Sequence, residues 1–198
     1  MTYDLRGRKT QLVSPDAGTW NYAYNGLGEM ISQTDAKGQV TTQFHDALGR
    51  LIERREYPGD TTTTPFVTVW SYDQYAGGGT CPQGIGKLCE TRSATLSRGA
   101  TLGGALDLIS SASGGNHSVA RSTQFDAYGR AERQVTELRE PGSAAPTLRR
   151  WVSATSYDAE SRPDKTTYPS GFTLANRYTA WSGALDQVSE WPDGKVHW

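Results

Sequence analysis

The stretch His45-Asp46-Ala47-Leu48-Gly49-Arg50-Leu51 decides the fold, because its frame recurs along the chain. The frame is a ring side chain, an Asp, two variable residues, a Gly and an Arg. Copies begin at positions 3, 24 and 45, and the step from Tyr157 to Tyr178 is again 21 residues. A fixed period of this size is typical of a repeat architecture. The other copies are Tyr3-Asp4-Leu5-Arg6-Gly7-Arg8, Tyr24-Asn25-Gly26-Leu27-Gly28-Glu29, Phe125-Asp126-Ala127-Tyr128-Gly129-Arg130 and Tyr157-Asp158-Ala159-Glu160-Ser161-Arg162.

The frame has the residue types of a tight turn. Asp or Asn is favoured at the first position of a type I turn, and Gly at the fourth. The Asp side chain can accept hydrogen bonds from the turn amides. The Gly can take a positive φ and form the bulge that ends a three-residue hairpin loop. Each copy therefore predicts one antiparallel β-hairpin, with the repeat-turn residues Asp4, Gly7, Asn25, Gly28, Asp46, Gly49, Asp126, Gly129 and Asp158.

Residues 1–57 predict five strands, at about 9–14, 19–24, 29–34, 39–45 and 50–57. A second kind of turn alternates with the first and contains Pro15-Asp16-Ala17-Gly18 and Asp35-Ala36-Lys37-Gly38. Aromatic residues in the second strand alternate onto one face. A further strand is predicted at 66–73.

The period is disturbed between residues 72 and 117. Tyr72-Asp73 begins another copy, and Gly84-Ile85-Gly86-Lys87-Leu88 resembles its delayed end. Residues 93–117 are expected to form an insertion or a long irregular hairpin tip within one repeat segment that covers residues 1–198. Regular strands are expected to resume near Ser118.

The composition fits an all-β chain with a thin core. Hydrophobic residues are 35% of the chain, below the roughly 45–50% of an ordinary globular domain. The formal charge of −1 argues against bulk attraction to nucleic acid. No apolar run approaches the roughly 20 residues of a membrane span. The first residues lie inside a repeat and have no signal-peptide pattern.

The recurrent frame and its spacing resemble the YD repeats of Rhs proteins, which are related to repeats in the B and C components of Tc toxins and in teneurins. The resemblance implies a curved strip of consecutive hairpins, part of a hollow β-shell. It also implies a longer bacterial protein, secreted or at the cell surface, whose other repeats and C-terminal toxin or effector domain would be the partners of this segment. The departures from the pattern are His45 at a ring position, Glu29 in place of Arg and Ser161 in place of Gly.

No catalytic, metal-binding or cofactor-binding site is predicted. His45 occupies a ring position, His117 lies in a Gly-rich loop, and His197 lies on a predicted strand. None has a ligand partner at metal-site spacing, and Gly77-Gly78-Gly79 lacks the Lys-Ser/Thr of a phosphate loop. A hydrolase that uses Asp107, His117 and Asp126 is an alternative hypothesis.

Cys81 and Cys89 are the two cysteines of the chain. On facing strands of a hairpin they could form a disulfide, which would contribute roughly 2–3 kcal/mol. In a reducing cytosol they would instead be two thiols packed in a wall. The sequence leaves both states open.

We therefore expect a non-enzymatic structural segment that encloses or presents another domain. The alternative is a cell-surface β-repeat module that binds a carbohydrate or a receptor through exposed members of its six Trp and ten Tyr residues. The Arg after each turn Gly is expected either to be solvated or to pair across strands with neighbouring acids such as Glu53 and Glu56. Unpaired strand edges are expected to promote self-association.

Overall fold

The chain is all-β in the computed structural model, which describes residues 1–95, 118–140 and 147–197. No helix occurs in these residues, so none is long and apolar enough to cross a membrane. The all-β prediction is confirmed. The strands are β1 (Thr2–Tyr3), β2 (Lys9–Ser14), β3 (Gly18–Tyr24), β4 (Met30–Thr34), β5 (Val40–His45), β6 (Leu51–Tyr57), β7 (Phe66–Tyr72), β8 (Gln74–Tyr75), β9 (Gly79–Thr80), β10 (Leu88–Thr95), β11 (Ser118–Phe125), β12 (Ala131–Glu140), β13 (Thr147–Tyr157), β14 (Pro163–Thr167), β15 (Thr173–Tyr178) and β16 (Leu185–Trp191).

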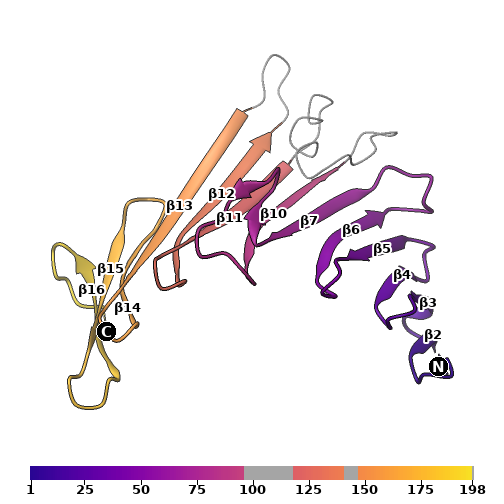
Figure 1. The fold of residues 1–198 in the computed structure, drawn as a ribbon, viewed down its shortest axis with the longest axis horizontal. Coiled ribbons are helices and arrows are strands. Elements are labelled where there is room, and N and C mark those ends of the chain that lie inside the picture. Colours follow the sequence, from indigo (N-terminus) through magenta and orange to yellow (C-terminus); the bar gives the residue numbers. More distant parts are fainter. Residues whose placement is uncertain (96–117, 141–146, 198) are drawn as a thin grey trace. The chain divides into compact units, whose positions relative to one another are not determined.

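Hydrogen-bonded neighbours follow the order of the chain (Figure 1). Within the described residues, β1 to β7 and then β10 to β16 form one fourteen-stranded sheet, and β8 pairs only with β9. Every strand pair with a resolved register is antiparallel, as a string of hairpins requires. Of the insertion predicted at 93–117, Ser93–Thr95 belongs to β10, and the rest lies outside the described residues.

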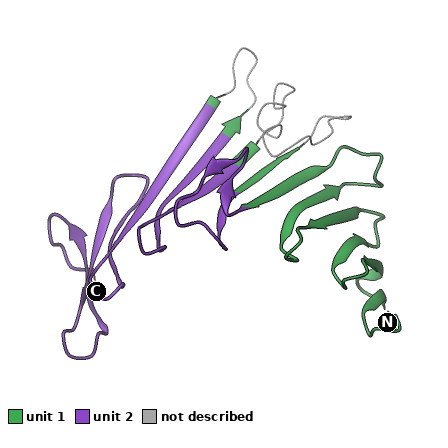
Figure 2. Cartoon of the chain, viewed as in Figure 1, with its two compact units in different colours: residues 1–71, 91–119, 139–147 green, residues 72–90, 120–138, 148–198 purple. Residues whose placement is uncertain are grey.

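The chain divides into two compact units (Figure 2). Unit 1 contains residues 1–71, 91–119 and 139–147, and therefore all of β1 to β6. Unit 2 contains residues 72–90, 120–138 and 148–198, and therefore β8, β9 and all of β14 to β16. Each unit is described by itself below.

Five hairpins of the repeat have a register shift directly before their ring residue. The shifts lie between Thr2 and Tyr3, Ala23 and Tyr24, and Phe44 and His45 in unit 1. In unit 2 they lie between Ser156 and Tyr157 and between Arg177 and Tyr178. A shift at these points is the bulge expected of a turn that ends with a left-handed residue. Gly49 has φ 77°, and Ser161, which replaces Gly in its copy, still has φ 66°.

The 46–49 turn and the 35–38 turn share one backbone hydrogen-bond pattern. The Gly49 amide donates to the Asp46 carbonyl at 3.0 Å, and the Gly38 amide donates to the Asp35 carbonyl at 3.1 Å. Consecutive turns of an antiparallel meander lie at opposite ends of the strands. The 46–49 and 35–38 turns therefore lie on opposite sides of the sheet. Asp35 Oδ1 also accepts hydrogen bonds from the amides of Lys37 and Gln39, both at 2.8 Å.

Few side chains of the described residues are fully buried. In unit 1, Val67 and Ala94 form the described core cluster, with Val69 packed against it. In β3, Trp20, Tyr22 and Tyr24 are half-buried, whereas the residues between them are exposed. This alternation is that of a sheet with one partly covered face, and it leaves contacts between neighbouring hairpins to hold much of the structure.

Candidate functional site

The turns that follow a ring residue, at 4–7, 25–28, 46–49, 126–129 and 158–161, carry the polar side chains of the repeat. We call them the ring-Asp turns. In the 46–49 turn, Asp46 Oδ1 accepts hydrogen bonds from the amides of Leu48 and Arg50, both at 2.9 Å. The Asp46 amide donates to the Arg50 carbonyl, also at 2.9 Å. The Asp side chain therefore replaces a missing backbone partner inside the turn.

The Arg of each copy pairs with the Asp of its own turn. Arg50 Nε lies 2.7 Å from Asp46 Oδ2. The same contact is 2.6 Å in Arg8–Asp4 and Arg130–Asp126, and 2.7 Å in Arg162–Asp158.

The prediction that these Arg residues pair with acids on the neighbouring strand, such as Glu53 and Glu56, was wrong. Arg55 binds Glu53, and Arg54 Nη2 lies 3.2 Å from Glu56. The turn brings its fifth residue back over its first, which places the Arg against the turn Asp.

The turn carboxylates are held in the ionised form. For Asp4, the hydrogen bond from the Arg8 amide is the main cause of a lowered pKa. For Asp46, partial burial acts to raise the pKa, but the hydrogen bonds from Arg50 and Leu48 outweigh it, and the net pKa is lowered. Asp126 and Asp158 follow the Asp46 pattern and also have lowered pKa values. A carboxylate with a lowered pKa is a poor proton donor at neutral pH.

Arg8, Arg130 and Arg162 also contact the ring of the next copy. The Arg8 guanidinium lies 4.9 Å from the centre of the Tyr24 ring. The Tyr24 hydroxyl in turn donates to the Lys9 carbonyl at 2.9 Å, one residue after that Arg. We call this arrangement of Asp, Arg and following ring the clamp.

The clamp recurs in unit 2. Arg130 lies 4.5 Å from the Tyr157 ring, and the Tyr157 hydroxyl donates to the Ala131 carbonyl at 2.8 Å. Arg162 lies 4.4 Å from the Tyr178 ring, and the Tyr178 hydroxyl donates to the Pro163 carbonyl at 2.9 Å. The cation–π contact and the hydroxyl hydrogen bond both join one repeat to the next.

Successive ring-Asp turns also touch directly. In unit 1, Arg6 Nη1 donates to the Gly26 carbonyl at 2.6 Å, and Arg8 Nη1 donates to the Asn25 carbonyl at 2.9 Å. In unit 2, Arg130 Nη1 donates to Ser161 Oγ at 2.9 Å. Neighbouring ring-Asp turns are therefore joined by side-chain hydrogen bonds as well as by strand pairing.

The copy that begins at Tyr72 keeps part of the clamp despite an insertion. The Asp73 amide donates to the Lys87 carbonyl at 3.0 Å, as the Asp46 amide does to Arg50, and the Gly86 amide donates to Asp73 Oδ1 at 2.6 Å. Lys87 takes the place of the Arg and lies 4.6 Å from the centre of the next ring, Phe125. The delayed end suggested by the sequence is thus the closing half of this turn.

The inserted residues form a small lobe at the sheet surface in unit 2. The β8–β9 hairpin is attached through the Tyr75 hydroxyl, which donates to the Thr123 carbonyl at 2.9 Å, and through the Ala76 amide, which donates to Glu90 Oε2 at 2.8 Å. Burial, together with the Glu90 charge, raises the pKa of Tyr75.

A disulfide joins Cys81 to Cys89, with 6.3 Å between the Cα atoms. The two residues do not lie on facing strands of one hairpin, because Cys81 follows β9 and Cys89 lies in β10. A Cβ on Gly84 would collide with both sulfur atoms, so the chain can pass here only as Gly.

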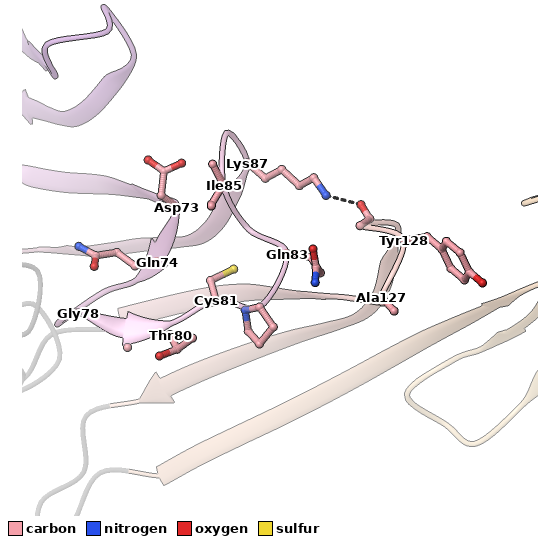
Figure 3. A pocket seen from close by; sticks show the side chains of 13 residues that line it. Asp73, Gln74, Gly78, Thr80, Cys81, Gln83, Ile85, Lys87, Ala127 and Tyr128 are labelled. Atoms are coloured by element: carbon pink, nitrogen blue, oxygen red, sulfur yellow. Dashed lines mark hydrogen bonds between the residues drawn. The ribbon is translucent and has the colours of Figure 1, made fainter.

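A hollow of about 730 Å³ lies beside this lobe (Figure 3). Its walls come from the inserted residues and from the 126–129 turn. Lys87 extends across it to the Gly129 carbonyl at 2.5 Å. The lining mixes backbone with Gln, Thr, Ile and Tyr side chains, and the one cation in it is committed to a backbone partner.

The second copy departs from the clamp in a correlated way. Asn25 and Glu29 replace Asp and Arg, and Asn25 Nδ2 donates to Glu29 Oε2 at 2.6 Å. The ring of the next copy is His45, whose Nδ1 lies 3.9 Å from the same Glu29 oxygen and has no hydrogen-bond partner. An acidic residue, Glu29, now stands at the Arg position, and a basic residue, His45, stands at the ring position of the next copy. The contact between the two copies lies at the same place as in a regular clamp.

The remaining candidate residues do not converge. His197 Nε2 lies 2.7 Å from Glu190 Oε1, and His117 and Asp107 lie outside the described residues. Asp126, the third member of the hydrolase hypothesis, is engaged by its own turn. No group of three potential metal ligands occurs in residues 1–95, 118–140 and 147–197.

Comparisons with known proteins give one family match and several similar structures. The RHS repeat family profile matches residues 24–63. No match was found among the curated proteins.

The similar solved structures are complexes of Tc toxin components. The TcdB2–TccC3 crystal structure has a TM-score of 0.41 at 15% identity, with 98% of this chain and 12% of that chain covered. The TcdB2–TccC3–Cdc42 crystal structure has a TM-score of 0.40 at 16% identity, with coverages of 98% and 11%. A Photorhabdus luminescens Tc holotoxin pore with a mutated TccC3 has a TM-score of 0.41 at 15% identity, with the same coverages. The chain spans about one ninth of the length of these structures.

Proposed function

We propose that this chain, an Rhs-type YD-repeat protein, is a non-catalytic wall segment that encloses or presents a C-terminal toxin or effector domain of a longer secreted bacterial protein. Its identity as a YD-repeat protein rests on the RHS repeat at 24–63 and on the recurrence of the same turn in both units. The observation that carries the proposed function is the clamp, because it uses the charged and aromatic side chains of the repeat to fasten one hairpin to the next.

The clamp explains how such a wall would keep its register. An unsupported sheet can slip by two residues without moving its apolar face. A clamp tyrosine has its ring over one Arg, and its hydroxyl donates to the carbonyl of the residue after that Arg. These two contacts fix each hairpin in register against its neighbour. Right-handed strand twist then acts on a strip of fixed register and would bend it into a curved wall. The partners in this scheme are the other repeats of the chain and the enclosed domain.

The proposal is tested with the full-length protein by limited proteolysis. The domain that follows the repeats should resist trypsin in the native protein and become sensitive when two clamps are removed by Tyr24→Leu and Tyr157→Leu. Tyr128→Leu, at an exposed ring outside the clamps, serves as the control and should leave the domain protected. Equal cleavage of the domain in the native protein and in the isolated domain would exclude enclosure.

One observation supports a second candidate, binding of carbohydrate by exposed aromatic rings. Tyr168 and Phe172 have their ring centres 6.2 Å apart and are both less than half exposed, and Trp191 is 54% exposed with Lys165 Nζ 3.8 Å from its ring centre. Aromatic faces beside polar groups can stack on sugars. A glycan array should detect binding that Trp191→Ala abolishes if this candidate is right, and an array without signal argues against it.

A further inference from the structure

Asn25 is the one asparagine of the chain that precedes a glycine, since Asn21, Asn116 and Asn176 precede Tyr, His and Arg. Asparagine is a thermolabile residue, because the backbone nitrogen of the next residue can attack its side-chain carbonyl. A glycine has no Cβ to hinder that attack. Asn25 therefore combines a reactive side chain with the least hindered nucleophile, the nitrogen of Gly26.

The folded turn engages the carboxamide of Asn25 at both of its polar atoms. Oδ1 accepts hydrogen bonds from the amides of Leu27 and Glu29, both at 3.0 Å. Nδ2 donates to Glu29 Oε2 at 2.6 Å. An attack at Cγ converts this planar group into a tetrahedral one and breaks these hydrogen bonds, so the folded turn opposes the reaction.

Glu29 is the reason that this turn holds an amide rather than a carboxylate. In a regular copy the fifth position is an Arg, which pairs with the turn Asp, as Arg8 does with Asp4 at 2.6 Å. An Asp in place of Asn25 would put a carboxylate where Nδ2 now lies 2.6 Å from the Glu29 oxygen. Two carboxylates at that distance repel each other. This copy therefore needs the amide that the following glycine makes chemically unstable.

We infer that Asn25 is a site of spontaneous deamidation, which is restrained while the second hairpin is folded and released when that hairpin opens. The backbone nitrogen of Gly26 gives its proton to water and bonds to Asn25 Cγ. The Cγ–Nδ2 bond breaks, Nδ2 leaves as ammonia after protonation by solvent, and a cyclic succinimide remains. Water then opens the ring at either carbonyl and leaves Asp or isoaspartate at position 25. The reaction requires no oxidant or reductant.

The product disturbs contacts on both sides of the second copy. Arg8 Nη1, from the first copy, donates to the Asn25 carbonyl at 2.9 Å. Glu29 Oε2 lies 3.9 Å from Nδ1 of His45, in the third copy. A new carboxylate repels Glu29, and isoaspartate adds a backbone atom inside the turn. A chain that is modified while open therefore cannot re-form this turn, whatever domain the repeat segment encloses.

Peptide mass spectrometry of the purified chain, held in neutral buffer with and without urea, tests the inference. In urea, Asn25 should deamidate faster than Asn21 and Asn176. In the folded chain its rate should be at least about tenfold lower than in urea, because a hydrogen bond to a charged group adds that much to a barrier. Gly26→Ala, for which the turn has open space, should slow the reaction in both states.

Two variants of the folded chain test the restraint by Glu29. Glu29→Ala removes the acceptor of the Asn25 amide and should increase the rate of deamidation. The control is Glu53→Ala, which removes the same charge where it contacts Arg55 and should leave the rate unchanged. Circular dichroism checks that both variants fold.

The effect of the product is measured separately, so the inference stays testable if Glu29→Ala does not fold. Asn25→Asp makes one of the two products and should lower the urea midpoint. Addition of Glu29→Gln should restore the midpoint, because an amide again donates to a carboxylate. The inference is overturned if Asn25 stays intact in urea, if it reacts equally fast in folded and unfolded chains, or if Asn25→Asp is as stable as the native chain. A folded Glu29→Ala variant that deamidates no faster than Glu53→Ala would overturn it as well.

Discussion

The hydroxyl of a clamp tyrosine should stabilise the joint between two repeats by a measurable amount. In Tyr157→Phe the ring stays over Arg130, but the hydrogen bond of 2.8 Å to the Ala131 carbonyl is lost. Removal of one partner of a shielded hydrogen bond costs about 1 kcal/mol. Tyr157→Leu also removes the cation–π contact, which contributes about 0.5–1 kcal/mol more, so the leucine variant should lose about 2 kcal/mol in all.

Tyr128 offers a control with the same chemistry. Its ring also lies near Arg130, at 4.8 Å, but it is 83% exposed. Tyr128→Phe removes a hydroxyl that water replaces, so its effect should stay within about 0.5 kcal/mol. Because Arg130 faces both rings, a difference between the two Tyr→Phe variants measures the clamp hydrogen bond rather than a general effect of the hydroxyl.

Native-state hydrogen exchange combined with urea unfolding provides the measurement. The midpoint in urea should fall in Tyr157→Phe with an unchanged slope, and amide protection should fall first in β12 to β14. The reasoning is refuted if Tyr157→Phe and Tyr128→Phe have equal midpoints. It is also refuted if protection is lost evenly over unit 2, because the clamp would then not be a local joint.

Three further predictions concern the clamp and the disulfide. Glu29→Arg with His45→Tyr, completed by Asn25→Asp, should raise Tm by about 2–4 °C by building a regular clamp, and calorimetry that shows no gain over the single variants would contradict this. The clamp aspartates have lowered pKa values, so the stability they contribute should be present above the ordinary value of 3.8 and lost as the pH falls through the lower folded-state value; urea midpoints that do not change from pH 5 to pH 2 would count against it. Cys81→Ser with Cys89→Ser should cost about 2.5 kcal/mol for a sequence separation of 8, and proteolysis should then begin between the two positions.

The sequence predicted the hairpins because their cause is local. An Asp and a Gly three residues apart determine the turn, and the bulge places the next strand, so the bounds of β2 to β6 differ from the expected ranges by about one residue. The partner of the Arg was mispredicted because strand periodicity says which face a side chain occupies and says nothing of how a turn folds back on itself.

Prediction of the contact between copies requires the register between neighbouring strands. The sequence of a single copy does not contain that register. Arg8 and Tyr24 are 16 residues apart in the chain and opposite each other in the sheet. A signal was present in the sequence, however. Glu29 and His45 depart from the frame at the same spacing of 16 residues, and two correlated departures point to residues that touch.

The interrupted copy has a consequence for what the repeat can carry. Asp73 and Lys87 close their turn with one backbone hydrogen bond of 3.0 Å, although fourteen positions rather than four separate them. The turn therefore tolerates added chain between its first and last residues without losing its hold on the next repeat. Each ring-Asp turn is thus a site at which a peptide could be inserted, provided that the two ends of the insertion meet as Asp73 and Lys87 do. A repeat sheet built this way could carry different inserted segments in different repeats while the register between its strands stays the same.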